Sequence, residues 1–334
     1  MLMPKKHNKK IFIVVIFILV SLIFIFASVS RDKDHTRFNV VVKNGTSLHD
    51  MASMLKKEGF IFSSNLFVLT SLMYGGKLIA GEYELRKDMS TLEIVRKMGR
   101  SERNLYVLQI VEGHNIYDVG DTTEKNKIME KREFLRLAGD KKYLRDLGIT
   151  ADSLEGYLSP DTYYYSKEID TDKFIEKIVQ RTLKYFERED IKRQMETFNL
   201  DINKTLTLAS MIEKEAKMGN EKTLVSAVFH NRLLKDMPFD SDPTVTYGTR
   251  AFHSSITKSD LKAHTPYNTY AFKGFPRGPI CNPDKNSIMA ALNPAPVDYL
   301  FFVAKNDGTH VFSKDMNEHN RNVGMYQRSK TVKK

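Results

Sequence analysis

A run of apolar residues near the start of the chain, Ile11–Val29, constrains the fold more than any other feature. Only Ser21 and Ser28 interrupt these 19 residues. As a helix, the run would be roughly 28 Å long, which is close to the hydrocarbon thickness of a bilayer, about 30 Å. The run therefore predicts a transmembrane helix. Residues 27–29, Ala-Ser-Val, match a signal-peptide cleavage site poorly, and removal of the run as a signal peptide is the alternative interpretation.

The charges that flank this run indicate its orientation. Four lysines lie within residues 1–10, whereas residues 31–34 carry charges of both signs. Positively charged residues stay on the cytoplasmic side of a membrane. The pattern predicts a cytoplasmic tail at residues 1–10 and a single-pass anchor at residues 11–29 in the cell (inner) membrane. The remainder of the chain is then extracytoplasmic, or periplasmic where a periplasm exists.

The net charge of +11 does not indicate nucleic-acid binding. Four lysines near the N-terminus and four basic residues between 328 and 334 carry most of it, so the middle of the chain is only mildly basic. Cys281 is the only cysteine, which excludes an intrachain disulfide and a cysteine-rich metal site. The nine histidines show no metal-binding spacing. We therefore predict no nucleic-acid partner, no metal and no cofactor.

The first 110 extracytoplasmic residues alternate between strand and helix signals. Strand, turn and capped-helix patterns occur in one order and then begin again, which suggests two diverged β/α modules. Strands are expected at 38–42, 81–85 and 106–111, and helices at 48–59, 66–74, 90–99 and from 116.

From Phe134 onward, helical patterns dominate. Amphipathic helices are expected at 172–187, 204–218 and 221–234, followed by long loops beyond Pro238. A β-hairpin is expected at 299–304 and 310–312, around the turn sequence Asn-Asp-Gly at 306–308. The pattern as a whole predicts an α+β fold with long loops, and long ordered loops tend to be functional.

The sequence LTLASMIEKEA, residues 206–216, places a glutamate among apolar residues. At 100° per residue, Glu213 falls inside the apolar face of the helix and Glu215 falls near its edge. A carboxyl group in apolar surroundings tends to keep its proton near neutral pH, as the general acid of glycosidic cleavage must. The sequence therefore predicts Glu213 as a catalytic acid. The alternative is a structural glutamate at the edge of the core, paired with a lysine or arginine.

Several motifs together resemble the endolytic murein transglycosylase family (MltG or YceG-like). They follow an apolar N-terminal anchor in a specific order: GEY at 81–83, VEG at 111–113, LEGYLSPDTY at 154–163, the block around Glu213, FHNRL at 229–233, SDPTVTYG at 241–248, PYNTY at 266–270, GFPRGPI at 274–280 and HN at 319–320. The resemblance extends from about residue 38 to residue 325. Three details depart from the family pattern, because Tyr157, Ser159 and Arg277 stand where other residues are common, and the chain has no tryptophan.

The resemblance implies a domain organisation and an activity. It implies a LysM-like region at 38–150, a mainly helical catalytic domain at 151–325 and a basic tail at 326–334. The implied substrate is peptidoglycan, cut within its glycan strands by a membrane-anchored lyase that acts in cell wall biogenesis and degradation. The family's catalytic glutamate is the first of the EKE sequence, Glu213. A role in ending the growth of new strands, beside peptidoglycan synthases, is also implied.

Lytic cleavage of the bond between N-acetylmuramic acid (MurNAc) and N-acetylglucosamine (GlcNAc) needs one carboxyl group, which acts as acid and then as base and leaves a 1,6-anhydroMurNAc end. Hydrolysis would need two carboxylates, for which Asp161, Asp242 and Glu155 are the candidates. Side chains suited to sugar hydroxyls or sugar faces predict the substrate contacts, with turn stabilisation as the alternative role. These residues are Glu155, Tyr157, Asp161, Tyr163, Asp242, Thr244, Tyr247, Asn268, Tyr270 and Asn282. The competing functions are a non-catalytic peptidoglycan-binding scaffold and a hydrolytic muramidase.

Overall fold

The structure is a computed structural model of the 334-residue chain. It describes residues 35–100, 104–167, 169–216, 218–250, 252, 255–305 and 307–328, together with a few positions between 12 and 29. Most of the predicted anchor lies outside these residues. Among those that are described, no helix has the length and apolar character needed to cross a bilayer.

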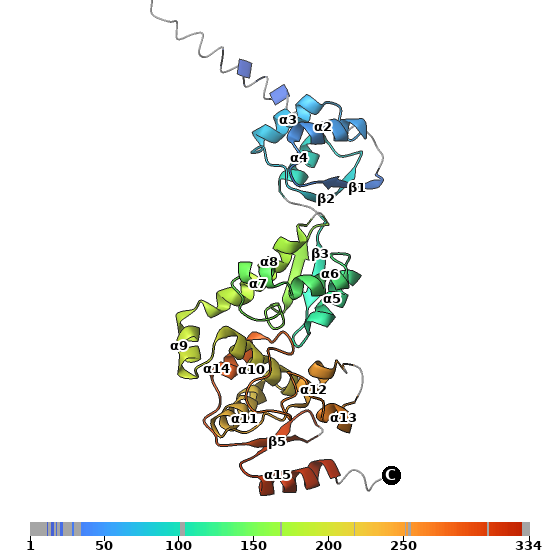
Figure 1. The fold of residues 1–334 in the computed structure, drawn as a ribbon. Helices are drawn as coiled ribbons and strands as arrows, with labels where there is room; N and C mark the ends of the chain where they lie inside the picture. Colours follow the sequence, from blue (N-terminus) through green and yellow to red (C-terminus); the bar gives the residue numbers. More distant parts are fainter. Residues whose placement is uncertain are drawn as a thin grey trace, which may run out of the picture. The chain divides into compact units, whose positions relative to one another are not determined.

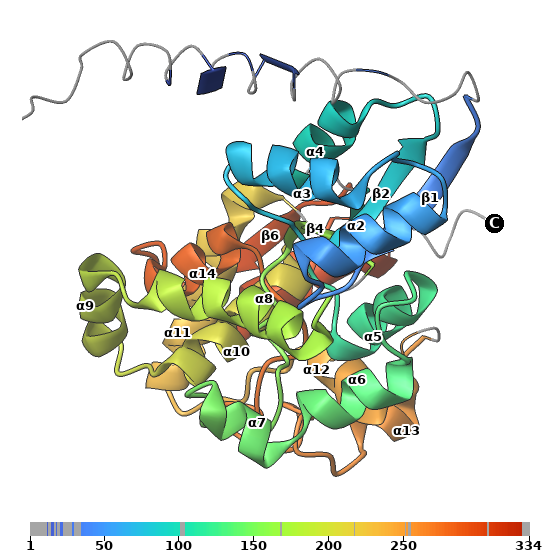
Figure 2. The same ribbon diagram turned by 90° about the horizontal axis from the view of Figure 1, so that it is seen from above.

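The chain divides into two compact units. The first comprises residues up to Val107 together with Tyr164–Asp170. Its antiparallel strands pair with Arg37 opposite Arg86 and Val42 opposite Gly81. The helices α2, α3 and α4 lie against this pair (Figures 1 and 2). The elements are β1 (Arg37–Val42), α2 (Leu48–Lys57), α3 (Ser64–Met73), β2 (Gly81–Arg86) and α4 (Thr91–Gly99).

The local sequence explains these elements. Serine side chains at 47, 63 and 90 accept backbone N–H bonds at the starts of the three helices, as N-cap residues do. Tyr83 is completely buried between the strands and helices, and its hydroxyl donates to the carbonyl oxygen of Ile79 at 2.7 Å. The predicted strands and helices of this unit are therefore confirmed.

The second unit comprises Leu108–Tyr163 and the chain from Thr171 onward. Strands β3 (Tyr106–Ile110) and β4 (Asp161–Tyr165) form a two-stranded sheet, and the division between the units falls within them. The helices around this sheet are α5 (Ile116–Lys125), α6 (Lys131–Ala138), α7 (Lys141–Asp146), α8 (Thr171–Phe186) and α9 (Glu189–Thr197).

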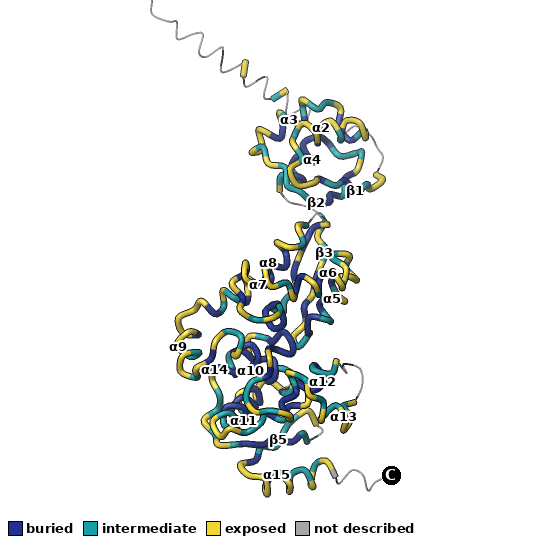
Figure 3. Tube along the Cα trace, viewed as in Figure 1, coloured by how far each residue is buried: buried dark blue, intermediate teal, exposed yellow. Residues whose placement is uncertain are grey.

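Helix α10 (Ile202–Glu215) lies at the centre of this unit, and every residue from Thr205 to Ile212 is buried (Figure 3). It packs against α11 (Lys222–Leu234), α12 (Asp242–Thr249) and α14 (Lys285–Leu292). The remaining elements are the short helices η1 (Gly219–Glu221) and α13 (Lys258–Leu261), the hairpin β5 (Phe301–Ala304) and β6 (His310–Ser313), α15 (Met316–Val323) and η2 (Gly324–Arg328). The mixed α+β class and the C-terminal hairpin are confirmed.

The boundary at residue 150, which the sequence suggested, does not match the two units. Residues 108–150 belong to the second unit, because backbone bonds tie them to it. Gly113 donates to the carbonyl oxygen of Asn282 at 2.9 Å, and Leu154 donates to that of Ala138 at 2.9 Å. Strand β3 pairs with β4, the next strand along the chain, as β1 pairs with β2 in the first unit.

Candidate active site

The end of α10 places Glu215 in a pocket of about 540 Å³. The helix ends there because Ala216 adopts an extended conformation, whereas the sequence had predicted a helix to Met218. The walls come from α11, from the loop that contains Phe239 and Asp240, from Tyr270, and from β5 and α15. This size lies within the range of small-ligand pockets, about 300–1,000 Å³.

Burial sets the protonation of Glu215. Removal of its carboxyl group from water raises the pKa to about 7, and the nearby charge of Asp242 acts in the same direction. Opposing this rise, the Ser241 hydroxyl donates to Oε1 at 2.7 Å, and the positive charge of Arg232 favours the carboxylate. The balance leaves a carboxyl group that is able both to release and to accept a proton near neutral pH.

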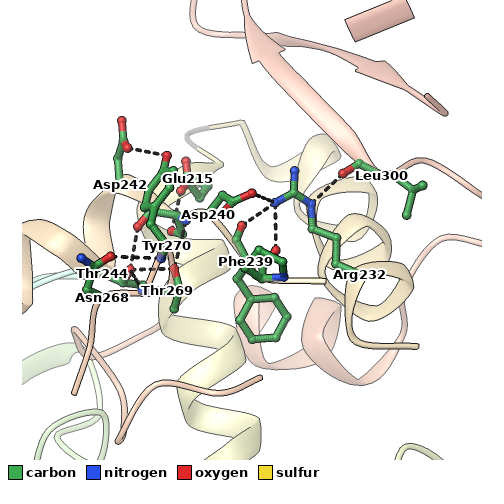
Figure 4. Close-up of polar contacts among 12 residues, drawn as sticks. Glu215, Arg232, Phe239, Asp240, Asp242, Thr244, Asn268, Thr269, Tyr270 and Leu300 are labelled. Atoms are coloured by element: carbon green, nitrogen blue, oxygen red, sulfur yellow. Dashed lines mark hydrogen bonds and ion pairs between the residues drawn. The ribbon is translucent and has the colours of Figure 1, made fainter. Parts of the chain in front are cut away.

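Two residues predicted from the sequence, Asp242 and Tyr270, line the same pocket (Figure 4). The Tyr270 hydroxyl donates to Oδ1 of Asp242 at 2.8 Å. Burial, together with this bond to Asp242, raises the pKa of Tyr270. The pair therefore presents a neutral phenol and a carboxylate beside Glu215, both suited to hold sugar hydroxyls.

Arg232 on α11 holds the loop and the hairpin that form the pocket walls (Figure 4). Its guanidinium donates to the carbonyl oxygens of Leu300 at 2.7 Å and Phe239 at 2.9 Å, and to the carboxylate of Asp240 at 2.9 Å. It also lies 5.1 Å from the ring centre of Phe301, over the ring. Arg232 thus joins three segments of chain and supplies positive charge near Glu215.

His319 on α15 lines the pocket on the side of the hairpin. Its imidazole stacks on the ring of Phe301 at 5.2 Å. Burial and the charge of Arg232 lower the pKa of His319, so the ring is neutral at physiological pH. Among the described residues its buried Nδ1 has no hydrogen-bond partner.

The structure gives Glu213 a different environment from the one expected. Its carboxylate accepts bonds from Lys222 Nζ at 3.1 Å, Ser287 Oγ at 2.6 Å and the backbone N–H of Asp284 at 3.0 Å. Lys222 also donates to Asp284 at 2.9 Å. The surroundings of this carboxylate are polar and cationic, so the apolar environment inferred from helical phase was wrong. The contacts match the structural alternative, an ion-paired glutamate at the edge of the core.

Three predicted substrate contacts are buried and bonded within the protein. Asn282 accepts from the backbone N–H of Leu158 and donates to the carbonyl of His114, both at 2.9 Å. Asn268 donates to the carbonyls of Leu261, the last residue of α13, and of Ala263 in the loop that follows. The Thr244 hydroxyl donates to the carbonyl of Ser241 at 2.6 Å. These bonds match the alternative role, stabilisation of turns and loops, and substrate contact by these three residues stays an untested prediction. The buried residues are Thr244, Asn268 and Asn282.

Glu155 is also enclosed within the protein, with 1% of its surface exposed. Its Oε2 accepts from the Tyr247 hydroxyl at 2.8 Å and from the backbone N–H of Ile116 at 3.0 Å. Burial raises the pKa of Glu155 to about 8. The next residue, Gly156, has a φ of +83°, and a Cβ there would lie 2.6 Å from Cγ of Pro279. Glu155 therefore joins α5 to α12, which matches a structural role.

The remaining predicted residues lie away from Glu215. Tyr157 is buried, and so is Tyr163, whose hydroxyl donates to the carbonyl of Ser159 at 2.6 Å. Asp161 forms an ion pair with Arg181 and lines another pocket of about 420 Å³, whereas Tyr247 lines a third. In the part of the chain that the structure describes, no cluster of three or more His, Cys, Asp or Glu side chains is arranged to hold a metal.

The pocket around Glu215 is lined by some residues that the sequence analysis selected and by others that it did not select. Of the predicted residues, Asp242 and Tyr270 meet at the Glu215 pocket. Sequence reasoning did not select Glu215, Arg232 or His319, which also line this pocket. All three stand in motifs that the sequence analysis had noted. For Arg232, the available signal was an arginine beside apolar residues in FHNRL, and the structure shows that this arginine is buried.

Comparison with known proteins identifies the family. Residues 40–325 match the model of the YceG-like family. The chain belongs to the YceG-like family. This membership confirms the resemblance inferred from the motifs.

Relatives of this YceG-like chain include an endolytic murein transglycosylase of Bacillus subtilis (strain 168), 33% identical over 317 residues, covering 89% of this chain and 87% of the relative. An endolytic murein transglycosylase of Streptococcus pneumoniae (strain D39) is 25% identical over 325 residues, covering 87% of this chain and 58% of that protein. A crystal structure of a putative YceG-like protein from Listeria monocytogenes is also similar, with a TM-score of 0.60 and 30% identity. The match covers 86% of this chain and 99% of the other.

Proposed function

We propose that this YceG-like protein is an endolytic murein transglycosylase, which cleaves the bond between MurNAc and GlcNAc within the glycan strands of peptidoglycan. The names of the Bacillus and Streptococcus relatives support the reaction class. The observation that carries the proposal is the carboxyl group of Glu215. It is half-buried, desolvation raises its pKa to about 7, and it lines an open pocket of about 540 Å³.

The proposed reaction uses Glu215 twice. Its carboxyl proton passes to the glycosidic oxygen as the bond from that oxygen to MurNAc C1 breaks. The resulting carboxylate then accepts the proton of the MurNAc C6 hydroxyl, whose oxygen forms the new bond to C1. The products are a GlcNAc hydroxyl and a 1,6-anhydroMurNAc end, and Glu215 regains its proton. A pKa near the working pH suits a group that acts as acid and then as base.

Neighbouring groups support each step. The carboxylate of Asp242 places negative charge in the pocket, which favours the positive charge that develops on the sugar. The hydroxyl oxygen of Tyr270, whose proton is donated to Asp242, can accept a bond from a sugar hydroxyl, and the neutral ring of His319 lines the same pocket. Arg232 holds the walls in place and lowers the cost of the Glu215 carboxylate after proton transfer.

We assign the acid to Glu215 rather than to Glu213, the residue that the sequence and the family resemblance suggested. Glu213 forms an ion pair with Lys222 and accepts two further bonds at the start of α14, so its carboxyl oxygens are already engaged within the protein. The two glutamates lie about 200° apart around α10, so they face different sides of the helix.

We also propose that Ile11–Val29 anchors the protein in the cell membrane, with the N-terminus in the cytoplasm and both units outside. The length of the apolar run and the lysines before it support this arrangement. The first unit would act as a LysM-like module that holds glycan close to the membrane. In that position the enzyme would end the growth of new strands beside the synthases.

The end groups of the products test the reaction. Full-length protein in mild detergent is incubated with purified peptidoglycan in water enriched in oxygen-18, and the soluble fragments are analysed by mass spectrometry. The expected fragments carry 1,6-anhydroMurNAc ends and no heavy oxygen. Reducing ends that contain heavy oxygen would indicate a muramidase, and an absence of fragments would indicate a binding scaffold.

A further inference from the structure

A second pocket, of about 380 Å³, adjoins the one that contains Glu215. Asp242 lines both pockets. Lys214 lines the second pocket and precedes Glu215 on α10, so the two side chains point in directions about 100° apart. The two pockets therefore meet at Asp242, and a chain of sugars in one could continue into the other.

The lining of this pocket combines apolar and charged groups. Tyr247, Pro243 and Ile280 provide an aromatic and aliphatic surface. Lys214, Asp118 and Asp242 provide an ammonium group and two carboxylates. A pyranose ring has C–H groups on its faces and hydroxyls at its edge, so it requires this combination of apolar surface and polar groups. The mixture of both charge signs favours a neutral sugar ring over a ligand with a single strong charge.

Lys214 has the capacity to bind a ligand here. Its Nζ donates to the carbonyl oxygen of Gly113 at 3.4 Å, which is a long hydrogen bond. Lys222, in contrast, makes two bonds to carboxylates, at 3.1 and 2.9 Å. Lys214 is exposed and the pocket lies open beside it, so its ammonium group can donate to a sugar hydroxyl or to an acetamido oxygen.

We propose that this second pocket is a sugar subsite. It binds the amino sugar next to the scissile bond, and Lys214 is the residue that selects it. This inference rests on the proposed function of the Glu215 pocket. It also provides a physical reason for cleavage within strands, because a substrate that fills both pockets must extend beyond a single sugar.

The test compares Lys214→Met with Lys204→Met. Methionine keeps most of the length of the lysine side chain and removes its charge, and Lys204 is an exposed lysine in the first turn of the same helix. Initial rates are measured with uncrosslinked glycan fragments of two and of eight sugars. We expect Lys214→Met to raise KM for the eight-sugar fragment about tenfold, as the loss of a charged hydrogen bond would. The kcat value and its pH profile should remain as in the wild type, and Lys204→Met should leave all of these unchanged.

A second variant blocks the pocket without changing Lys214. Thr246 lines the pocket on α12, and Thr246→Trp would fill it. This variant should also raise KM for the eight-sugar fragment, while weak binding of the two-sugar fragment to the Glu215 pocket persists. Correct folding of each variant is checked by circular dichroism.

The outcomes separate this inference from the proposed function. A wild-type KM in both the Lys214→Met and the Thr246→Trp variants would overturn the subsite. A change in the pH profile of Lys214→Met with unchanged KM would also overturn it, because Lys214 would then act only through the charge of Glu215. If Glu215→Gln still cleaves glycan, the assignment of the acid fails instead, and if the wild-type protein releases no anhydro-ended fragments, the proposed function fails, whatever the two pocket variants do.

Discussion

Glu213 and Glu215 are separated by one residue and have opposite environments. Lys222, a serine hydroxyl and a backbone N–H surround the carboxylate of Glu213 and stabilise its charge. Glu215 accepts one hydroxyl bond and is otherwise withdrawn from water, so its proton is retained to higher pH. Two identical side chains acquire different chemistry because their neighbours differ.

The pKa of Glu215 makes a prediction for the pH dependence of activity. Because burial raises this pKa to about 7, the acid form predominates below that pH. We expect kcat/KM for glycan cleavage to fall about tenfold for each pH unit above about 7, as the acid form is lost. Initial rates from pH 5 to pH 9 measure this dependence. Activity that stays constant up to pH 9 would be inconsistent with Glu215 as the proton donor.

Residue patterns predicted part of the site. Asp242 and Tyr270 were found because carboxylates and phenols in a Pro- and Asn-rich loop suit sugars, and both line the pocket. The same reasoning also selected Asn268 and Asn282, whose amide groups stabilise loops instead. Helical phase ranked Glu213 above Glu215, because phase describes one helix and does not reveal Lys222, which approaches from another.

At the scale of elements, the sequence predicted most strands and helices but not their partners. Serine caps and hydrophobic periodicity located α2, α3 and α4. No glycine or proline follows α10 at once, so its end at Glu215 was not visible and the helix was extended to Met218. The pairing of β3 with β4 joins segments far apart in sequence, and local patterns do not encode such a choice.

The bonds of Arg232 predict a large effect on stability. Arg232→Ala leaves the Asp240 carboxylate and the carbonyls of Leu300 and Phe239 without their donor. We expect the free energy of unfolding to fall by about 3 kcal/mol, measured by denaturant titration. Lys235→Ala, at the exposed end of the same helix, is the control and should change it by less than about 0.5 kcal/mol. Equal effects of the two substitutions would mean that Arg232 does not hold the walls together.

At the scale of the whole molecule, each unit has its own hydrophobic core. Val42, Leu55, Phe67 and Tyr83 belong to the core of the first unit. The centre of the second is α10, whose buried residues pack against α11 and α14. Separate cores predict separate unfolding.

Differential scanning calorimetry of the full-length protein should therefore show two transitions. Leu55→Ala removes side-chain volume from the first core, at a cost of about 2–5 kcal/mol, and should lower the temperature of one transition only. Arg232→Ala should lower only the other transition. A single transition that both variants shift equally would show that the two units unfold together.

The central claim is that Glu215 supplies the proton for cleavage, and paired substitutions test it most directly. Release of anhydro-ended fragments from purified peptidoglycan is measured for Glu215→Gln and Glu213→Gln, at a temperature where circular dichroism shows both to be folded. We predict that Glu215→Gln lowers the rate by about 10²–10⁴-fold, the usual contribution of a general acid, whereas Glu213→Gln keeps most of the activity and loses stability. Wild-type release by Glu215→Gln, with loss of release in Glu213→Gln, would contradict the claim.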